Sequence, residues 1–299
     1  MPMPTNNRND VIETDRVSRS FAGVPALRDL TLRVPRGGIY GFLGRNGSGK
    51  TTAIKILSGL IKPDGGSVRV LGRTPFEFTP EDRQRVGYMS EKQVLPANYK
   101  VGKLIAFCAQ FYPRWDHDLV ARLLARFRID ANAQIRNLSN GTQRQVAFIL
   151  ALAQRPELLI LDEPASTLDT VARRELLDEI LSLIREDDIT VFISSHILSD
   201  IERVADHIGI LVDGSLKVSE PLDDLKETIK QVRFYSFANG MDRFSLHGAL
   251  RTQRSGNEML VTGRFEDEAG IAQVAKEFGA QYEITSLPLE EIFVELSSH

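Results

Sequence analysis

The sequence has little of several features that mark common classes of protein. Its 299 residues include one cysteine, and 37 Lys plus Arg nearly balance 40 Asp plus Glu, which leaves a net charge of −3. Because a nucleic-acid-binding surface is basic, this balance favours no nucleic-acid partner. The longest apolar runs, such as residues 146–153, are far shorter than the roughly 18–20 residues that cross a bilayer. We therefore expect no membrane-spanning segment and no nucleic acid among the partners.

The N-terminal segment and the cysteine usage bear on location. The start, MPMPTNNRND, lacks the basic and then apolar pattern of a secretory signal, so we expect a flexible tail over residues 1–10. The single cysteine, Cys108, lies in the apolar segment IAFCAQF, where a buried thiol is more common than a reactive one. Both features favour a cytoplasmic location.

Apolar segments alternate with helical patterns along most of the chain. Segments such as GGIYGFLG and LLILDEP are separated by longer helical stretches, a pattern typical of an α/β sheet with crossover helices. Residues 27–34 and 66–72 instead alternate with a period of two, which predicts antiparallel strands beside the main sheet. Between about residues 95 and 153 the strand signals vanish, and apolar residues at helical spacing predict a helical subdomain.

A second, smaller unit is expected after Pro221, which opens a linker helix. The strand-like VRFYSF and EMLVTGRF, the helical AGIAQVAKEF and the capped terminal helix SLPLEEIFVEL indicate a small α+β unit. A chain of this length is long enough for a main domain and a small one. We therefore predict a main domain over residues 11–220 and an accessory domain over residues 221–299.

Residues 44–52, GRNGSGKTT, fit the pattern G-x-x-x-x-G-K-[ST] and lie between a strand-like and a helical segment, as a phosphate-binding P-loop requires. Glycines let consecutive backbone N–H groups turn toward phosphates, and the helix N-terminus adds positive potential. Lys50 is expected to reach the β- and γ-phosphates of ATP, and the Thr51 hydroxyl to bind Mg²⁺. The alternative is a glycine turn that only caps a helix. The expected nucleotide-binding residues are Gly44, Asn46, Gly47, Ser48, Gly49, Lys50, Thr51 and Thr52.

Two adjacent carboxylates end the apolar segment LLILDEP. Neighbouring side chains on a strand point to opposite faces, so Asp162 and Glu163 can take different roles. Asp162 would hold Mg²⁺, and Glu163 would orient and deprotonate the attacking water. The alternative is an acidic strand end that only feeds a turn. His196 ends another predicted buried strand, where it is either a structural hydrogen-bonding group or lies near the γ-phosphate and assists hydrolysis.

Taken in order, these motifs resemble the nucleotide-binding subunits of ATP-binding cassette (ABC) transporters over about residues 10–220. The resemblance implies that Phe21 stacks on adenine and that residues 44–52 are the P-loop. It also implies that Asp162 is the metal-binding aspartate and that Glu163 is the catalytic glutamate. The implied fold class is α/β, a P-loop NTPase with a mixed sheet core, an antiparallel β subdomain and a helical subdomain, here with a small C-terminal α+β domain.

The same resemblance gives a role to LSNGTQRQ, residues 138–145, a polar segment without a strong nucleophile or base. In this family two cassettes dock head to tail, and this signature segment of one subunit covers the ATP on the P-loop of the other. A dimer loop that ends at Asp169 and a switch histidine, His196, complete the implied site. A plain helix-capping turn is the alternative for the segment alone. The residues expected to face the partner's ATP are Leu138, Ser139, Asn140, Gly141 and Thr142.

The sequence departs from the family pattern at two places. The usual signature is L-S-G-G-Q, whereas Asn140 and Thr142 stand here at a glycine position and at the glutamine position. In the segment GYMSEKQ, Glu91 stands where the family often has a glutamine that contacts Mg²⁺ and faces the membrane partner. A carboxylate can also bind Mg²⁺, so we include Glu91 among the expected metal ligands.

A single cassette, Glu91 in that loop and a C-terminal extension with a PLEEIF helix are similar to the ATPases of type-2 exporters. We therefore expect an ATPase that uses ATP and Mg²⁺, forms a homodimer and powers a separate membrane permease from the inner face of the membrane. The permease is expected in a groove between the Glu91 loop and the helical subdomain. Candidates for its lining are Phe107, Phe111, Tyr112 and Trp115.

Two other function classes are alternatives to the exporter. A soluble cassette ATPase that acts on ribosomes or DNA would carry two cassettes or a long coiled coil, whereas this chain has one P-loop and no sustained heptads. A P-loop kinase or GTPase would need an acceptor pocket or a guanine-reading motif, and it leaves residues 138–145 unexplained. The soluble ATPase is the stronger of these two alternatives.

Overall fold

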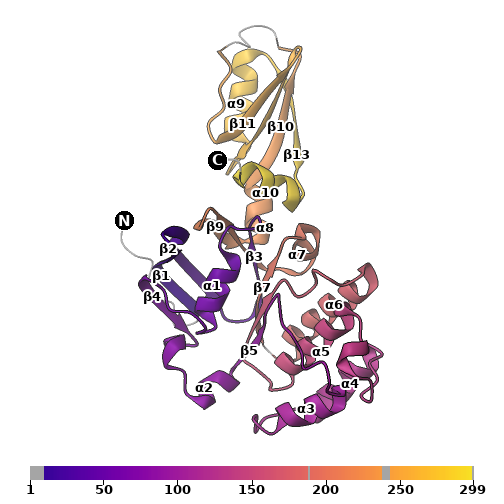
Figure 1. Ribbon diagram of the computed structural model, residues 1–299. Helices are drawn as coiled ribbons and strands as arrows, with labels where there is room; N and C mark the ends of the chain where they lie inside the picture. Colours follow the sequence, from indigo (N-terminus) through magenta and orange to yellow (C-terminus); the bar gives the residue numbers. More distant parts are fainter. Residues whose placement is uncertain (1–9, 188, 238–242, 298–299) are drawn as a thin grey trace. The chain divides into compact units, whose positions relative to one another are not determined.

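The computed structural model describes residues 10–187, 189–237 and 243–297. The chain forms two compact units, residues 1–219 and 220–299, and each is described by itself (Figure 1). The tail expected over residues 1–10 lies outside the described residues except for Asp10. No helix in the described part of the chain has both the length and the hydrophobicity of a membrane span.

An antiparallel sheet with the strand order β2-β1-β4 forms one layer of the first unit. Because side chains alternate between the faces of a strand, Leu30, Leu32 and Val34 are buried, whereas Thr31 between them is exposed. Leu30, Leu32 and Val34 belong to a hydrophobic core cluster of the unit. The strand bounds are β1 (Asp10–Phe21), β2 (Val24–Pro35) and β4 (Gly65–Val70).

A six-stranded sheet with the order β5-β6-β7-β3-β8-β9 is the second layer. The pairs β5–β6, β6–β7, β7–β3 and β3–β8 are parallel. Every residue of β6 and β7 is buried, as expected of parallel strands covered on both faces. The strand bounds are β3 (Gly38–Leu43), β5 (Val86–Met89), β6 (Leu158–Asp162), β7 (Thr190–Ser195), β8 (His207–Val212) and β9 (Ser215–Pro221).

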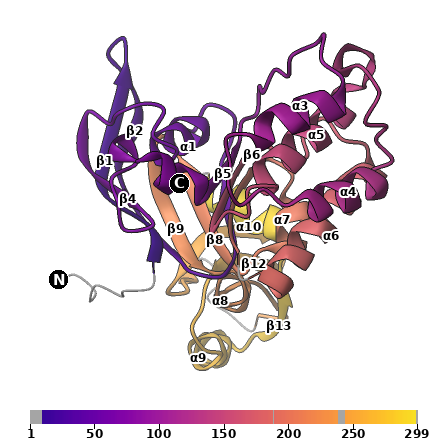
Figure 2. The same ribbon diagram turned by 90° about the horizontal axis from the view of Figure 1, so that it is seen from below.

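Helices cover this sheet, and three of them gather in one block. Figures 1 and 2 show α3, α4 and α5 together, apart from the antiparallel sheet. Aspartate or serine side chains cap two of these helices: Asp116 accepts from the N–H of Leu119 at 2.7 Å, and Ser139 accepts from that of Thr142 at 3.0 Å. The helix bounds are α1 (Lys50–Leu57), α2 (Pro80–Gln84), α3 (Val101–Ala109), α4 (His117–Arg126), α5 (Asn140–Leu152), α6 (Thr170–Asp187) and α7 (Leu198–Val204), with 3₁₀ turns at Pro75–Glu77 and Ile135–Asn137.

In the residues that the structure describes, the second unit is an antiparallel sheet of order β11-β12-β10-β13 with three helices. Val232 and Phe234 of β10 and Val261 of β12 pack with Ile271 and Ala275 of α9 in a core of their own. This core gives the unit the means to fold around its own apolar residues. The bounds are α8 (Leu222–Thr228), β10 (Ile229–Tyr235), β11 (Ala249–Ser255), β12 (Glu258–Arg264), α9 (Ala269–Phe278), β13 (Gln281–Ser286) and α10 (Leu289–Ser297).

Candidate functional site

The site lies where three neighbouring parallel strands end. In the register of the sheet, Leu43 of β3 is opposite Ser195 of β7, and Ser194 of β7 is opposite Asp162 of β6. Because the strands are parallel, the segments that follow them emerge at the same edge. The P-loop (residues 44–52), the acidic pair and His196 are therefore close in space although they are far apart in the sequence.

The P-loop has a backbone that depends on glycine. Gly47 and Gly49 have φ angles of +83° and +107°, which residues with a Cβ rarely adopt. At Gly49 a Cβ would also lie 2.3 Å from the carbonyl oxygen of Ala26. The loop therefore turns sharply into α1, whose first residue is Lys50. The free N–H groups at the start of a helix favour an anion such as phosphate.

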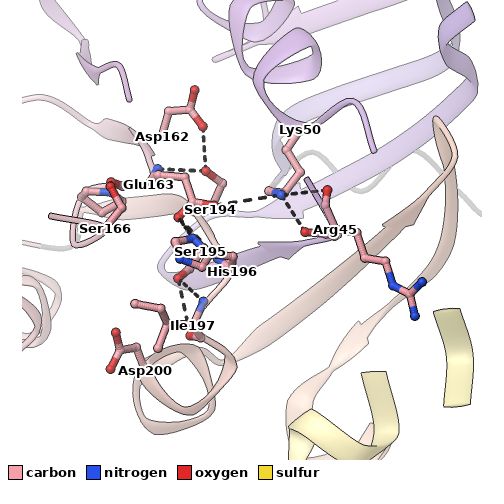
Figure 3. Close-up of polar contacts among 12 residues, drawn as sticks. Arg45, Lys50, Asp162, Glu163, Ser166, Ser194, Ser195, His196, Ile197 and Asp200 are labelled. Carbon is pink, nitrogen blue, oxygen red and sulfur yellow. Dashed lines mark hydrogen bonds and ion pairs between the residues drawn. The ribbon is translucent and has the colours of Figure 1, made fainter. Parts of the chain in front are cut away.

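The Lys50 ammonium is buried in this loop. Its Nζ donates to the carbonyl oxygens of Gly44 at 2.6 Å and Arg45 at 3.3 Å, and it lies 4.0 Å from Oε1 of Glu163 (Figure 3). Burial lowers the pKa of Lys50, although the nearby carboxylates, chiefly that of Glu163, raise it. An incoming polyphosphate would supply further negative charge and stabilise the ammonium form.

A pocket of about 430 Å³ opens over the P-loop. Of the predicted nucleotide-binding residues, Gly44 and Ser48 do not line the pocket. Phe21 is also outside the lining: its ring is exposed, and the guanidinium of Arg19 lies 4.9 Å from the ring centre. The lining residues are Ala26, Asn46, Gly47, Gly49, Lys50, Thr51, Thr52, Glu91, Glu163, Ser166 and His196.

Asp162 is a buried carboxylate with one oxygen that lacks a partner. Its Oδ1 accepts from the hydroxyl of Ser194 at 2.8 Å, whereas Oδ2 has no hydrogen-bond partner among the described residues. Burial raises the pKa of Asp162, and hydrogen bonds from Ser194 and Thr51 oppose this shift. A buried, unpaired carboxylate oxygen beside a threonine hydroxyl fits a hard cation such as Mg²⁺.

The donor set near Asp162 is small for a metal ion. Within the described residues, no three His, Cys, Asp or Glu side chains form a group able to bind a metal by themselves. Mg²⁺ commonly takes one or two carboxylates and completes its shell with water and phosphate oxygens. The arrangement therefore suits an ion that arrives with a nucleotide.

Glu163 is held by contacts on its backbone and its side chain. Its N–H donates to Oγ of Ser194 at 3.0 Å, and its carbonyl oxygen accepts from Oγ of Ser166 at 3.1 Å. Its Oε2 lies 2.7 Å from Nδ1 of His196 and accepts from the His196 N–H at 3.3 Å (Figure 3). The carboxylate therefore faces the pocket in a fixed position, as a general base needs.

The signature segment (residues 138–145) is not part of this pocket. Ser139, Asn140, Gly141 and Thr142 line a second pocket of about 450 Å³, together with Asp169 of the predicted dimer loop. Ser139 begins α5 as its cap, and its Oγ is also 2.8 Å from the Thr142 hydroxyl. Leu138 is not among the residues that line this pocket. One chain therefore has a P-loop pocket and a separate signature pocket.

Arg144 is a residue of the site that the sequence reasoning missed. Its side chain is buried, and burial lowers the pKa of its guanidinium. The only sequence signal is a cation two residues before the start of the apolar run VAFILALA. Its guanidinium donates to four backbone carbonyl oxygens, those of Pro164 (3.2 Å), Asp162 (3.3 Å), Glu163 and Glu91.

The aromatic residues proposed for a permease groove lie in different surroundings in the structure. A hollow of about 370 Å³ between β5 and the helical block includes Tyr112 in its lining, with Gln93 and Cys108. Phe107 and Phe111 are exposed, with ring centres 5.2 Å apart. Trp115, in contrast, is buried.

Comparisons with known proteins agree with this geometry. The family model described as ABC transporter matches residues 27–166. The ABC transporter ATP-binding protein YtrB of Bacillus subtilis (strain 168) is 35% identical over 73% of this chain and 74% of its own length. The Nod factor export ATP-binding protein I of Cupriavidus pinatubonensis is 29% identical over 99% of this chain and 93% of its own length.

The solved structure of an ATP-binding subunit of an ABC transporter has the same fold. It superposes with a TM-score of 0.66 and 28% identity, over 73% of this chain and 92% of that chain. The expected fold class, with a mixed sheet, an antiparallel layer and a helical block, is therefore confirmed.

Proposed function

The chain belongs to the ABC transporter family as an ATP-binding ATPase subunit, and on this premise we propose that it drives an exporter of the type-2 branch through a separate permease. The export assignment draws on the Nod factor export protein, which aligns with nearly the whole chain, including the second unit. The observation that carries the ATPase site is the single pocket in which Lys50, Glu163, His196 and Glu91 meet.

In the proposed reaction the chain's own residues bind, orient and take up a proton. Lys50 and the P-loop N–H groups hold the phosphates, and Thr51 and Asp162 would hold Mg²⁺, which offsets negative charge as the γ-phosphate is transferred. Glu163 accepts the proton of the attacking water, since its carboxylate faces the pocket and is within 2.7 Å of His196. His196 keeps that carboxylate oriented and adds a donor at the pocket's edge.

We place Glu91 at the edge of the same pocket as a further oxygen ligand. It follows β5, and its carbonyl oxygen is fixed by Arg144, while its side chain is exposed and lines the pocket. Because its backbone is fixed and its carboxylate is exposed, Glu91 could bind Mg²⁺ or contact a membrane partner.

Hydrolysis in this proposal needs a second copy of the chain. The P-loop pocket and the signature pocket are separate, so a chain cannot place its own Ser139 on its own γ-phosphate. Two copies arranged head to tail bring each signature pocket over the other's ATP, and the N-terminus of α5 then faces the phosphate. ATP thus acts as part of the interface, which couples its binding to closure of the dimer.

The proposed permease site is the hollow between β5 and the helical block. Exposed Leu60 lines the hollow, and the lining residues Cys108 and Tyr112 are next in sequence to Phe107 and Phe111, which form an exposed aromatic cluster with Tyr99. Exposed apolar groups that cluster beside a hollow are typical of a protein interface. A permease bound there would keep the chain at the inner face of the membrane.

Cys108 offers a direct test of this site because it is the chain's only cysteine and lines the hollow. In membranes that contain the product of a neighbouring permease gene, we expect a maleimide to label Cys108 several-fold more slowly than in the isolated chain. Burial raises the pKa of this thiol, so labelling is measured near pH 8. Phe111→Glu should restore fast labelling and release the chain from the membranes. Val294→Glu, a charge placed at an exposed apolar site of the second unit, is the control. Equal labelling in both settings would contradict the site.

A further inference from the structure

The backbone of Glu163 has a conformation that its neighbours must maintain. Its φ angle is +50°, in the left-handed region, which a residue with a Cβ adopts only at a cost in free energy. Such a conformation persists where surrounding contacts determine it. The Ser194 hydroxyl accepts from the N–H of Glu163, and the carbonyl oxygen accepts from both Ser166 and Arg144.

Among these contacts, Arg144 is the charged one and the one that reaches furthest. Its guanidinium also donates to the carbonyl oxygens of Pro164 and Glu91, so a single side chain ties the segment after β6 to the loop after β5. All of its hydrogen bonds in the described part of the chain go to backbone carbonyls. A buried guanidinium with this set of partners fixes the course of the chain more than it balances a particular carboxylate.

We propose that Arg144 is a positioning residue for hydrolysis, which holds the left-handed backbone of Glu163 in its own chain so that the carboxylate faces the attacking water. The proposal rests on the role of Glu163 as the base. It assigns Arg144 a function distinct from that of the signature segment in which it lies. The segment's first residues face the second pocket, whereas the guanidinium points to the P-loop side of the chain.

The simplest measurement separates positioning from folding and binding. A shift of about 1 Å in a catalytic group can lower a rate by up to about 10²-fold. We therefore expect Arg144→Gln to lower kcat by about 10- to 100-fold while KM and the affinity for a fluorescent ATP analogue stay within about twofold. Arg144→Lys, which keeps the charge and one donor group, should retain more activity. Arg136→Gln is the matched control, since Arg136 is exposed and bonds to Gln134.

A double substitution shows whether Arg144 acts through Glu163. In a Glu163→Gln background there is no base left to position, so adding Arg144→Gln should lower the residual rate no further. A further loss as large as in the wild-type background would overturn the proposal, as would a folded Arg144→Gln chain with wild-type kcat. Thermal melting shows whether each variant is folded. If Arg144→Gln does not fold, the same comparison with Arg144→Lys decides.

Mixing experiments show in which subunit Arg144 acts. Arg144→Gln mixed with Glu163→Gln before Mg-ATP is added should give no more activity than Arg144→Gln alone, because every intact Glu163 then sits beside a substituted Arg144. Activity regained in this mixture would mean that Arg144 supports the partner's site and would overturn the proposal.

Ser139→Arg mixed with Glu163→Gln is the positive control for mixing. One pocket of such a dimer combines an intact Glu163 with an intact signature segment, so this mixture should regain activity. If it stays inactive, the head-to-tail arrangement of the proposed function fails. The kcat comparison in the Glu163→Gln background still decides the role of Arg144 in that case.

Discussion

Replacing Glu163 by glutamine is the most direct test of the proposed chemistry. The amide has nearly the same shape, so its oxygen or nitrogen can still contact Nδ1 of His196, now 2.7 Å from Oε2. It cannot accept a proton, and general-base catalysis contributes about 10²–10⁴ in rate. We therefore expect hydrolysis to slow by at least about 10², which corresponds to about 2.7 kcal/mol in the activation free energy. Binding of ATP should persist, because Lys50 and the P-loop are unchanged.

The assay is single-turnover phosphate release with Mg-ATP, alongside titration of a fluorescent ATP analogue. Glu157→Gln is the control, because Glu157 directly precedes β6 at the strand's other end and pairs with Arg85 at 2.6 Å. This change removes an equivalent charge far from the pocket, so we expect hydrolysis near the wild-type rate. If Glu163→Gln hydrolysed ATP within about threefold of the wild-type rate, another residue would have to activate the water.

Three further predictions follow from the same geometry. Lys50→Ala should lower ATP affinity by about tenfold or more, because a charged hydrogen bond contributes roughly 1.5–3 kcal/mol; unchanged affinity in a fluorescence titration would reject Lys50 as a phosphate contact. Burial raises the pKa of Asp162, so its ionised form destabilises the ligand-free fold at neutral pH, and this destabilisation is lost as the pH falls through the raised pKa. Asp162→Asn should accordingly raise the free energy of unfolding at pH 7 and abolish stabilisation by Mg-ATP, and a lower melting temperature without ligand would contradict this. Ser139→Arg should keep ATP binding and lose hydrolysis, because Ser139 lines the other pocket; full ATPase activity would argue against the head-to-tail site.

The P-loop and the acidic pair could be predicted because local spacing sets their geometry. Glycines at 47 and 49 are needed for the positive φ angles found there, and the motif places Lys50 at the first residue of α1. Asp162 is the last residue of β6, and His196 directly follows β7. Because these strands are parallel neighbours, the topology of an α/β sheet brings the two residues together. Motif and topology together were enough to place these residues in one pocket or beside it.

Arg144 and Phe21 show what the sequence did not reveal. Whether Arg144 faces the sheet or solvent depends on how α5 is rotated against β5 and β6, and arginines are rarely buried, so composition favours the wrong answer. Phe21 ends β1, and a stacking role depends on where the strand tip lies relative to a nucleotide. Its ring now lies under Arg19, outside the pocket lining, so adenine stacking stays a prediction.

The Glu91 position joins these observations. A glutamate there adds a third carboxylate to those of Asp162 and Glu163. The negative charges of all three raise the pKa values of Lys50 and Arg144, against the larger lowering effect of burial. Arg144 binds the carbonyl oxygen of Glu91, so the loop is anchored through its backbone, and this anchor does not depend on whether the side chain is an amide or an acid. The side chain therefore stays available at the pocket's edge, where its extra charge strengthens the need for Mg²⁺ as a counter-charge. Glu91→Gln should therefore lower the Mg²⁺ dependence of ATPase activity without loosening the loop, whereas Arg144→Gln should loosen the loop and leave the Mg²⁺ dependence unchanged.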